Sequence, residues 1–483
     1  MTKLIFLREF QSLISDKKFI YSSIIIIGLM IINLLSFKIN YNNELDTYNR
    51  VNGERINALE YPADFMSEIF SSISGQRKLN FLGVLRAEQK IVEEPSTFVF
   101  ASSNHNFLPN GIKINYFEEE FPQYIKNTNH FLGNFIAMDW ENIILYFISF
   151  LCLMLSYNAF SGEKETGTLK LMLVNNISRS KIIMGKYLSL LTVITIPFLL
   201  GVLITVLALL FPNIQPDANL YLKLTLFLTV FILFVSLNIF IGFLISLLSK
   251  KSSVSLIYGI TVWILFLVIL PSSSWIMGRN KVQIENRATL NQNIKQQVNE
   301  VVFGNKDKYT RSWSGSWATK PPNEFVIKRV NGFNKEDEIR NSLQRDYIKR
   351  QFAQVDYSNR FSMLSPYAVF RLCSEKITGS GIYKTKKLYN DAMNYAGIFR
   401  EFMKDFDAND KESFHLISRD NTTARLFCSM REVNVGNIPR FIPSPTSLAN
   451  VTNSIKVEFI ILFLWCAILF WGVFVLFIKY DVR

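Results

Sequence analysis

The pattern of hydrophobic and polar positions contains six long stretches without a charged residue. They are Phe19–Phe37, Asn142–Phe160, Tyr187–Phe211, Leu224–Leu248, Val254–Met277 and Phe459–Ile478, with 19, 19, 25, 25, 24 and 20 residues. A helix needs about 20 apolar residues to cross the hydrocarbon core of a bilayer. The stretches lack the alternation of barrel strands. We therefore predict an α-helical polytopic membrane protein with six transmembrane helices.

The first stretch also has the position of a signal peptide. Its apolar run is longer than the usual apolar region of about 7–15 residues, and no small-x-small cleavage site follows it. We therefore interpret it as an uncleaved anchor. Burial of all six stretches in the core of a soluble protein is a poor alternative, because few soluble folds contain six such runs.

Basic residues near the span ends predict the orientation. Residues 1–18, 161–186, 249–253 and 479–483 together carry 13 Lys and Arg but only 5 Asp and Glu, whereas residues 212–223 carry one of each sign. Short loops rich in Lys and Arg stay on the cytoplasmic side. We therefore expect both termini in the cytoplasm, with an amphipathic helix at residues 1–18. Residues 38–141 and 278–456 become extracytoplasmic segments.

The two outer segments differ in pattern. Residues 38–141 predict a mixed α/β segment, with a helix at Tyr41–Ala58 and short strands at Phe98–Ala101 and Ile112–Phe117. We interpret the acidic run Glu118–Glu120 as a solvated loop. Residues 278–456 predict a mainly helical segment. Its helices are expected at Glu336–Asn359 and Lys384–Phe406, the latter after the breaker Gly379–Gly381.

Cysteine usage leaves one question open. Cys373 and Cys428 lie outside the spans, and an oxidising exterior would allow a disulfide between them, although the sequence gives no distance. Cys152 and Cys466 lie within spans, where we expect them only to pack.

The composition is consistent with this picture. Hydrophobic residues make up 49% of the chain and charged residues 19%, which excludes a disordered protein. The net charge of +13 would suit nucleic acid. However, much of the basic excess lies in the short cytoplasmic segments, where it sets orientation, so we expect no nucleic-acid partner. The second outer segment is also basic and could bind an acidic extracytoplasmic partner.

Several catalytic signatures are missing from the sequence. It has no G-x-x-x-x-G-K-[ST] phosphate loop, no H-E-x-x-H, no G-x-S-x-G and no C-x-x-C, and its three histidines are isolated. The six stretches contain no Asp, Glu, Lys, Arg or His, whereas proton- or ion-coupled carriers usually need such a residue within the membrane. We therefore expect no catalytic residue, metal or cofactor in this chain. If the protein moves something, a partner supplies the energy.

The cytoplasmic segment 161–186 is the most informative stretch. We predict a short helix at Thr166–Val174 with Leu169, Met172 and Leu173 on one face, and tight bends at Gly162 and Gly167. Such a helix offers an apolar ridge to a cytoplasmic partner. From the residues alone, contact with lipid headgroups explains it equally well.

Two motifs in this segment carry a family resemblance. The run S-G-E-K-E-T-G-T-L-K-L-M-L from Ser161, followed by S-R-S-K-I-I-M-G-K-Y-L from Ser178, resembles the coupling segment of ABC-2 (type-two) ABC exporter permeases. Arg8-Glu9-Phe10 resembles part of the amphipathic helix before the first span of that family. Leu364–Phe370, Thr378–Gly381 and Tyr480–Arg483 resemble a bacterial subgroup with two large extracytoplasmic segments.

The resemblance implies a permease of the bacterial cytoplasmic (inner) membrane rather than an enzyme. It would pair with a second permease subunit, identical or different, and with cytoplasmic ABC ATPase subunits that hold ATP and Mg. The family pattern assigns contact with the ATPase to Gly162, Glu163, Lys164, Glu165, Gly167, Thr168 and Leu169, and assigns Arg179 and Lys186 to anchoring the far end of the loop.

Three functions follow as hypotheses. The first is ATP-driven export of a lipid, a peptide or another amphipathic cargo, which the uncharged spans would suit. The second keeps the ATPase but uses the outer segments to transmit motion to an extracytoplasmic partner, without cargo transport. The third is a membrane anchor or receptor without transport.

Overall fold

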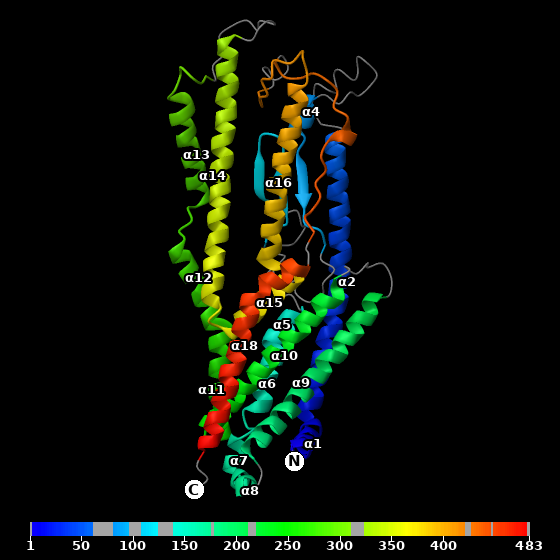
Figure 1. The fold of residues 1–483 in the computed structure, drawn as a ribbon, viewed down its shortest axis with the longest axis vertical. Helices are drawn as coiled ribbons and strands as arrows, with labels where there is room; N and C mark the ends of the chain where they lie inside the picture. The colour runs from blue at the N-terminus through cyan, green and yellow to red at the C-terminus, as the bar shows by residue number, and fades with distance from the viewer. Residues whose placement is uncertain are drawn as a thin grey trace.

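A computed structural model describes residues 2–60, 81–95, 108–123, 139–174, 178–210, 219–310, 323–420, 427–445 and 448–480. These described residues include six helical stretches that are long and apolar enough to cross a membrane, and they are mostly helical with one small sheet. The predicted fold class is confirmed. The two chain ends lie at the same end of the elongated molecule (Figure 1).

Each predicted span lies largely within one helical stretch of the structure. The second and fifth spans each contain a π-helical turn, labelled η1 and η2. The stretches are α2 (Lys17–Glu60); α5 (Trp140–Asn142), η1 (Ile143–Ile148) and α6 (Ser149–Ser156); α9 (Arg179–Leu210); α10 (Leu220–Leu248); α11 (Ser252–Ile264), η2 (Leu265–Ile269) and α12 (Leu270–Lys281); and α18 (Leu448–Lys479).

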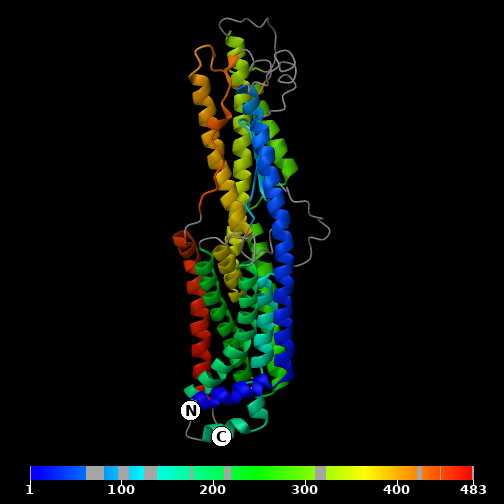
Figure 2. The same cartoon turned by 90° about the vertical axis from the view of Figure 1, so that its right-hand side faces the viewer.

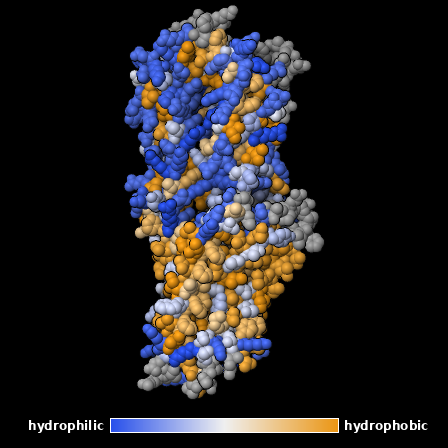
Figure 3. All heavy atoms as spheres, in the orientation of Figure 1, coloured by the Kyte–Doolittle hydropathy of each residue, from blue (hydrophilic) through white to orange (hydrophobic). Residues whose placement is uncertain are grey.

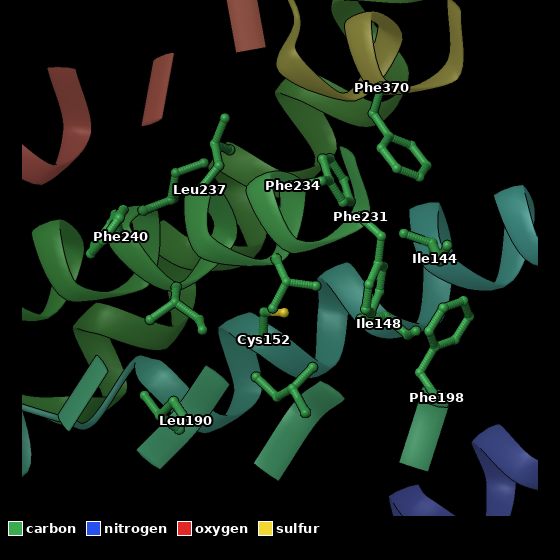
Figure 4. Packing of buried hydrophobic residues seen from close by; sticks show 14 of the residues in the cluster. Ile144, Ile148, Cys152, Leu190, Phe198, Phe231, Phe234, Leu237, Phe240 and Phe370 are labelled. Atoms are coloured by element: carbon green, nitrogen blue, oxygen red, sulfur yellow. The ribbon is translucent and has the colours of Figure 1, made fainter. Parts of the chain in front are cut away.

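The α10 helix forms the centre of the bundle. Its most apolar window is 72% buried, compared with 11% for the windows of the fifth and sixth spans. Phe231 and Phe234 of α10 point toward residues of η1, α9 and the later helix α15 (Pro366–Thr378) (Figure 4). A helix that is apolar on all sides belongs in a protein core or in lipid, and the burial of α10 places it in the protein interior. At the crossing with α6, a side chain at Gly242 would collide with Ser156, so this approach requires glycine.

An outer module extends beyond the bundle (Figures 1 and 2). We use this name for the outer half of α2 together with the elements that pack beside it. These are α4 (Phe81–Arg86), β1 (Gln89–Val92), β2 (Gly111–Ile114), β3 (Glu119–Gln123), α13 (Arg287–Val298), η3 (Asn299–Phe303), α14 (Glu324–Ser362), α16 (Gly381–Ala408) and η4 (Val435–Asn437).

The outer module has a core of its own. The strands form an antiparallel sheet in the order β1-β2-β3, with Ile91 opposite Ile112. Phe399 and Met403 of α16 are fully buried in the same cluster as these strand residues. The first outer segment therefore has the predicted mixed α/β character. The helix α16, which packs on its sheet, belongs to the second outer segment.

The predicted outer elements agree in part with the structure. The helix at Tyr41–Ala58 continues the first span within α2, and the helices at Glu336–Asn359 and Lys384–Phe406 lie within α14 and α16. The strand at Ile112–Phe117 corresponds to β2, which begins and ends earlier. The strand at Phe98–Ala101 lies outside the described residues.

The interpretation of Glu118–Glu120 as a solvated loop was wrong. Glu119 and Glu120 begin β3, and the Glu119 side chain is only 5% exposed. It accepts hydrogen bonds from Arg345 of α14, one of them from Nε at 2.7 Å, and forms an ion pair with Arg400 of α16 at 2.6 Å. Burial raises the pKa of Glu119, but the two arginines outweigh this and lower it. The acidic run therefore joins the sheet to two helices.

Part of the second outer segment returns into the bundle. The helix α15 (Pro366–Thr378) follows α14 after a short turn and packs against α10 and α18. Ser365 donates a hydrogen bond to the Phe266 carbonyl in the fifth span at 2.5 Å, and the Tyr367 hydroxyl donates one to Asn238 in α10. Residues 365–367 thus lie beside the middle of two spans. This part of the predicted extracytoplasmic segment 278–456 therefore packs among the spans.

The proposed Cys373–Cys428 disulfide is not formed in this structure. Both residues are buried free thiols. Cys373 packs in the core of the helix bundle, whereas Cys428 packs in the core of the outer module. The sequence could not reveal that the two cysteines belong to separate cores.

The buried carboxyl group of Asp337 in α14 should make the stability of the folded protein depend on pH. Its side chain is 8% exposed and pairs with Arg419 at 3.1 Å. Burial, opposed by Arg419 and Arg340, raises its pKa from 3.8 to about 7. Because the pKa of Asp337 is higher in the folded than in the unfolded protein, its protonated carboxyl group stabilises the fold. This contribution to stability is fully present below about pH 4 and is lost as the pH rises through about 7.

We expect Asp337→Asn to reduce this dependence, because the amide resembles the protonated acid. Wild-type protein should lose about 2 kcal/mol more stability than the variant between pH 5 and 8, since each pKa unit corresponds to about 1.4 kcal/mol. The measurement is thermal unfolding of the purified chain in detergent. Asp346→Asn, at an exposed position of the same helix, is the control. Parallel pH profiles for wild type and Asp337→Asn would contradict the assignment.

Candidate functional site

The coupling loop, residues 161–186, begins with two short helices. They lie just beyond the bundle, at the end of the molecule where both termini are found (Figure 1). They are α7 (Ser161–Glu165) and α8 (Thr168–Val174). Gly167 joins them with a φ of 72°, which glycine adopts without strain, so the predicted bend is confirmed there. Gly162 instead lies inside α7. A methyl group at Gly162 would meet Ser252 Oγ at 3.6 Å, an ordinary contact, so packing does not require glycine at this position.

Lys186 connects three helices below the bundle. Its side chain is 5% exposed, and its ammonium lies 2.6 Å from Glu163 Oε1 of α7 and 3.1 Å from Glu9 Oε1 of α1 (Thr2–Ile14). It also lies 5.8 Å from the centre of the Phe160 ring. One buried cation thus joins α1, α7 and the start of α9. Such a cluster resists separation, because removing one member leaves a buried charge uncompensated.

The helix α1 lies across the base of the spans (Figure 2). It packs on α9, where a side chain at Gly185 would approach Ile5 Cγ2 to 2.7 Å. Leu4 and Leu7 are exposed at 65% and 40%, whereas Ile5 and Phe10 pack against the bundle core. A helix with one apolar face toward the protein and further apolar residues exposed is suited to the membrane interface.

Lys164 holds the loop to the end of α10. Its ammonium donates hydrogen bonds to the backbone carbonyls of Ser246 at 3.5 Å, Ser249 at 3.2 Å and Leu247. The last carbonyls of a helix have no partner within it, and a cation there also compensates the helix dipole. In return, Ser246 Oγ accepts hydrogen bonds from the backbone N–H groups of Phe160 and Ser161 at the start of α7.

Glu165 and Arg179 connect the loop to two further spans. Glu165 accepts hydrogen bonds from Ser252 N at 3.1 Å and Ser252 Oγ at 2.8 Å, at the beginning of α11. Arg179 donates to the carbonyls of Phe477 at 2.8 Å, Tyr480 at 3.1 Å and Ile478, at the end of α18. The loop is therefore bonded to the near ends of α10, α11 and α18.

The comparisons with known proteins can now be set beside this geometry. A family model described as ABC-2 family transporter protein matches residues 4–482. The chain belongs to this family. A search of curated proteins found no match. As an ABC-2 family member with six apolar spans, the chain is a multi-pass membrane permease subunit of an ABC transporter. Such permeases associate with ATPase subunits and are generally not themselves catalytic.

The side chains of this permease loop divide into buried and exposed groups. Leu169 is 1% exposed, and Met172 and Leu173 are partly buried against the bundle core. The apolar ridge expected to face a partner or lipid therefore packs on the permease itself. The outward side chains form what we call the exposed loop surface: Glu165, Thr166, Thr168, Lys170 and Leu171.

The structure brings the nine predicted site residues into one region but gives them different tasks. Glu163, Lys164, Leu169, Arg179 and Lys186 bond or pack within the permease, and Glu165 does so while remaining exposed. Thr168 lies on the exposed loop surface. Among the described residues, no group of three or more His, Cys, Asp or Glu could hold a metal ion.

Sequence reasoning missed the partners of these residues. These partners are Glu9 of α1, Ser246 of α10 and Ser252 of α11, and they are separated from Glu163 by up to 154 positions in the sequence. None of them was assigned a role in the loop. Serine at a span end is a weak signal because serine is common there. The acidic Glu9 among basic neighbours was a stronger signal of a buried ion pair.

We expect Lys186→Met to destabilise the permease by about 3 kcal/mol, because Glu163 and Glu9 would lose their buried counter-charge. Lys181→Met, at an exposed position of the same helix, should change stability little. Thermal unfolding of the purified protein measures both effects.

Adding Glu163→Gln to Lys186→Met should restore part of the lost stability, because it removes one uncompensated charge. If the double variant is as unstable as the sum of the two single variants, Lys186 and Glu163 are not coupled.

Proposed function

We propose that this permease is the membrane subunit of an ATP-driven exporter and that a separate cytoplasmic ATPase binds the exposed loop surface. The observation that carries the proposal is the attachment of the coupling loop to the middle of α1 and to the near ends of three spans. Lys186 joins it to α1, Lys164 to α10, Glu165 to α11 and Arg179 to α18. A partner that displaces this loop therefore displaces several spans.

The proposed mechanism is a rigid-body movement. When ATP closes the partner ATPases, the loop moves with them, and its bonds carry the displacement to the span ends. Densely packed helices respond by changing between discrete arrangements rather than by bending continuously. The α10 helix, surrounded by other elements, would transmit the shift to the whole bundle. The charged contacts at the base would keep loop and span ends together during the cycle.

The spans favour an amphipathic cargo such as a lipid or a hydrophobic peptide. The six uncharged stretches contain no Asp, Glu, Lys, Arg or His, so they offer no intramembrane charge for a strongly ionic substrate. A second permease subunit would complete the translocation path. In the proposed orientation, both termini and the coupling loop lie on the cytoplasmic side of a bacterial inner membrane. Short segments rich in Lys and Arg stay on this side.

One observation favours transmission of motion to an outer partner as a second function. The helix α2 is continuous for 44 residues, and α14 for 39 residues ending beside the spans. Two uninterrupted helices thus connect the bundle to the outer module, whose sheet is joined to α14 and α16 through Glu119. Displacement of the bundle would reach the outer module without passing through a loop.

The exposed loop surface gives the first test. The permease is purified with its cognate ABC ATPase, and ATP hydrolysis is measured. We expect Lys170→Glu combined with Leu171→Asp to reduce permease-dependent ATP hydrolysis by about tenfold, because an exposed apolar and basic contact is lost. Thermal unfolding should be unchanged, since both side chains are exposed.

The control for this experiment is Lys250→Glu, which repeats the Lys-to-Glu part of the change at an exposed position of the turn between α10 and α11. It should retain most of the stimulation. A stable wild-type complex whose ATPase ignores the Lys170 and Leu171 changes would rule out this surface as the binding site.

The two functions make different predictions for the same complex in vesicles. Export predicts that a lipid or peptide fraction raises ATP hydrolysis and crosses the bilayer. Transmission of motion predicts neither effect, and cross-linking in cells should then capture a protein bound to the outer module.

A further inference from the structure

Pro271 lies within the fifth span, two residues after the π-helical turn η2. Proline has no backbone N–H, so one carbonyl of the preceding turn loses its donor. In a π-helical turn that carbonyl belongs to the residue five positions earlier, which here is Phe266. The other usual donor, the N–H of Leu270, bonds to the Leu265 carbonyl instead. Pro271 therefore leaves the Phe266 carbonyl without a donor from its own helix.

Ser365 supplies this donor from outside the span. Its hydroxyl donates a hydrogen bond to the Phe266 carbonyl at 2.5 Å, and the residue is fully buried. A buried carbonyl without a donor is costly, so the bond favours contact between the two segments. Ser365 is also the N-cap of α15, because its oxygen accepts hydrogen bonds from Tyr367 N at 3.2 Å and Ala368 N at 3.4 Å.

Tyr367 holds the same end of α15 against further spans. Its hydroxyl donates a hydrogen bond to Asn238 of α10, and its ring stacks on Phe266 with 6.3 Å between the ring centres. The second span joins this network through Ser149, the residue that follows its π-helical turn η1. Ser149 lies close to the Tyr367 hydroxyl and accepts a hydrogen bond from Trp263 Nε1 of the fifth span at 2.9 Å. Three spans therefore meet at the first turn of α15.

The position of α15 connects this network to the outer module. The helix lies where the hydrophobic bundle changes to the hydrophilic outer module (Figures 1 and 3). Its first turn lies among the spans, whereas Lys376 in its last turn pairs with Glu458 at 2.7 Å, beside the start of the sixth apolar stretch. The helices α14 and α16 of the outer module precede and follow it after short connections. A movement of the outer module would therefore act directly on α15.

We propose that the hydrogen bond from Ser365 to the Phe266 carbonyl, which we call the α15 latch, makes the position of α15 and the shape of the fifth span change together. While α15 is inserted, the carbonyl that Pro271 leaves free has a donor, and the π-helical turn is stable. When α15 moves outward, the carbonyl loses that donor, and the fifth span repacks into a second discrete arrangement. The α15 latch requires only bonds within this chain, so it does not depend on export activity.

Cys373 of α15 is a native reporter of this movement, because it is fully buried in the bundle core. The three other cysteines are replaced by alanine, and the full-length protein is placed in lipid nanodiscs. The measurement is the rate at which a water-soluble maleimide reacts with Cys373. A buried thiol reacts when its segment opens locally, so this rate reports how often α15 leaves the bundle.

Ser365→Gly should raise the rate by about tenfold, because glycine removes the donor but remains an acceptable N-cap. Pro271→Ala should raise it by a similar factor. The new N–H can satisfy the carbonyl within the span, which removes most of the advantage of docking α15. The double variant should react no faster than either single variant, because both changes remove the same interaction.

The matched control is Ser374→Ala. Ser374 is a second fully buried serine of α15, and its hydroxyl bonds within the helix to the Phe370 carbonyl at 2.9 Å. Its effect on the rate should multiply with that of Pro271→Ala. Thermal unfolding identifies a variant that does not fold, and Pro271→Ala, which only adds a helix donor, keeps the test available if Ser365→Gly is unstable. An unchanged rate in either folded single variant, or a double variant whose effect is the product of the two factors, would overturn the proposal.

Discussion

The base of this structure depends on one constraint: the final carbonyl groups of the membrane helices need hydrogen-bond donors from outside the helix. A helix satisfies its own backbone hydrogen bonds except at its ends, where water or side chains must do so. Here Lys164 bonds to the end of α10 and Arg179 to the end of α18. Because both basic residues belong to the coupling loop, satisfying the helix ends also attaches the loop to the spans.

The same principle explains why charge gathers at both boundaries of the bundle. The apolar stretches of the spans are uncharged, so the described ion pairs of the bundle lie near the span ends. At the base, Lys186 joins Glu163 and Glu9. At the outer boundary, Arg371 lies 3.1 Å from Glu375 and Lys376 lies 2.7 Å from Glu458. These two charged layers fix α15 and the coupling loop to an apolar bundle whose helix packing can still change between arrangements.

Sequence reasoning found the spans and the loop because both depend on local patterns. Span length and hydrophobicity follow from bilayer thickness, and the loop motif is continuous in sequence. It failed where the outcome depended on a distant partner. The acidic run around Glu119 was interpreted as solvated because Arg345 and Arg400 lie more than 200 residues away. The Leu169 face was predicted to point outward because the bundle surface beneath it was unknown.

The sequence by itself therefore determined the number of spans, the family resemblance and the position of the coupling loop in the chain. Only the tertiary structure decided which loop residues remain exposed, that α15 returns among the spans, that Cys373 and Cys428 occupy separate cores, and that Ser365 bonds to a carbonyl of the fifth span. The physical reason is that hydrophobic length is a property of one segment, whereas burial and charge pairing depend on segments that only folding brings together.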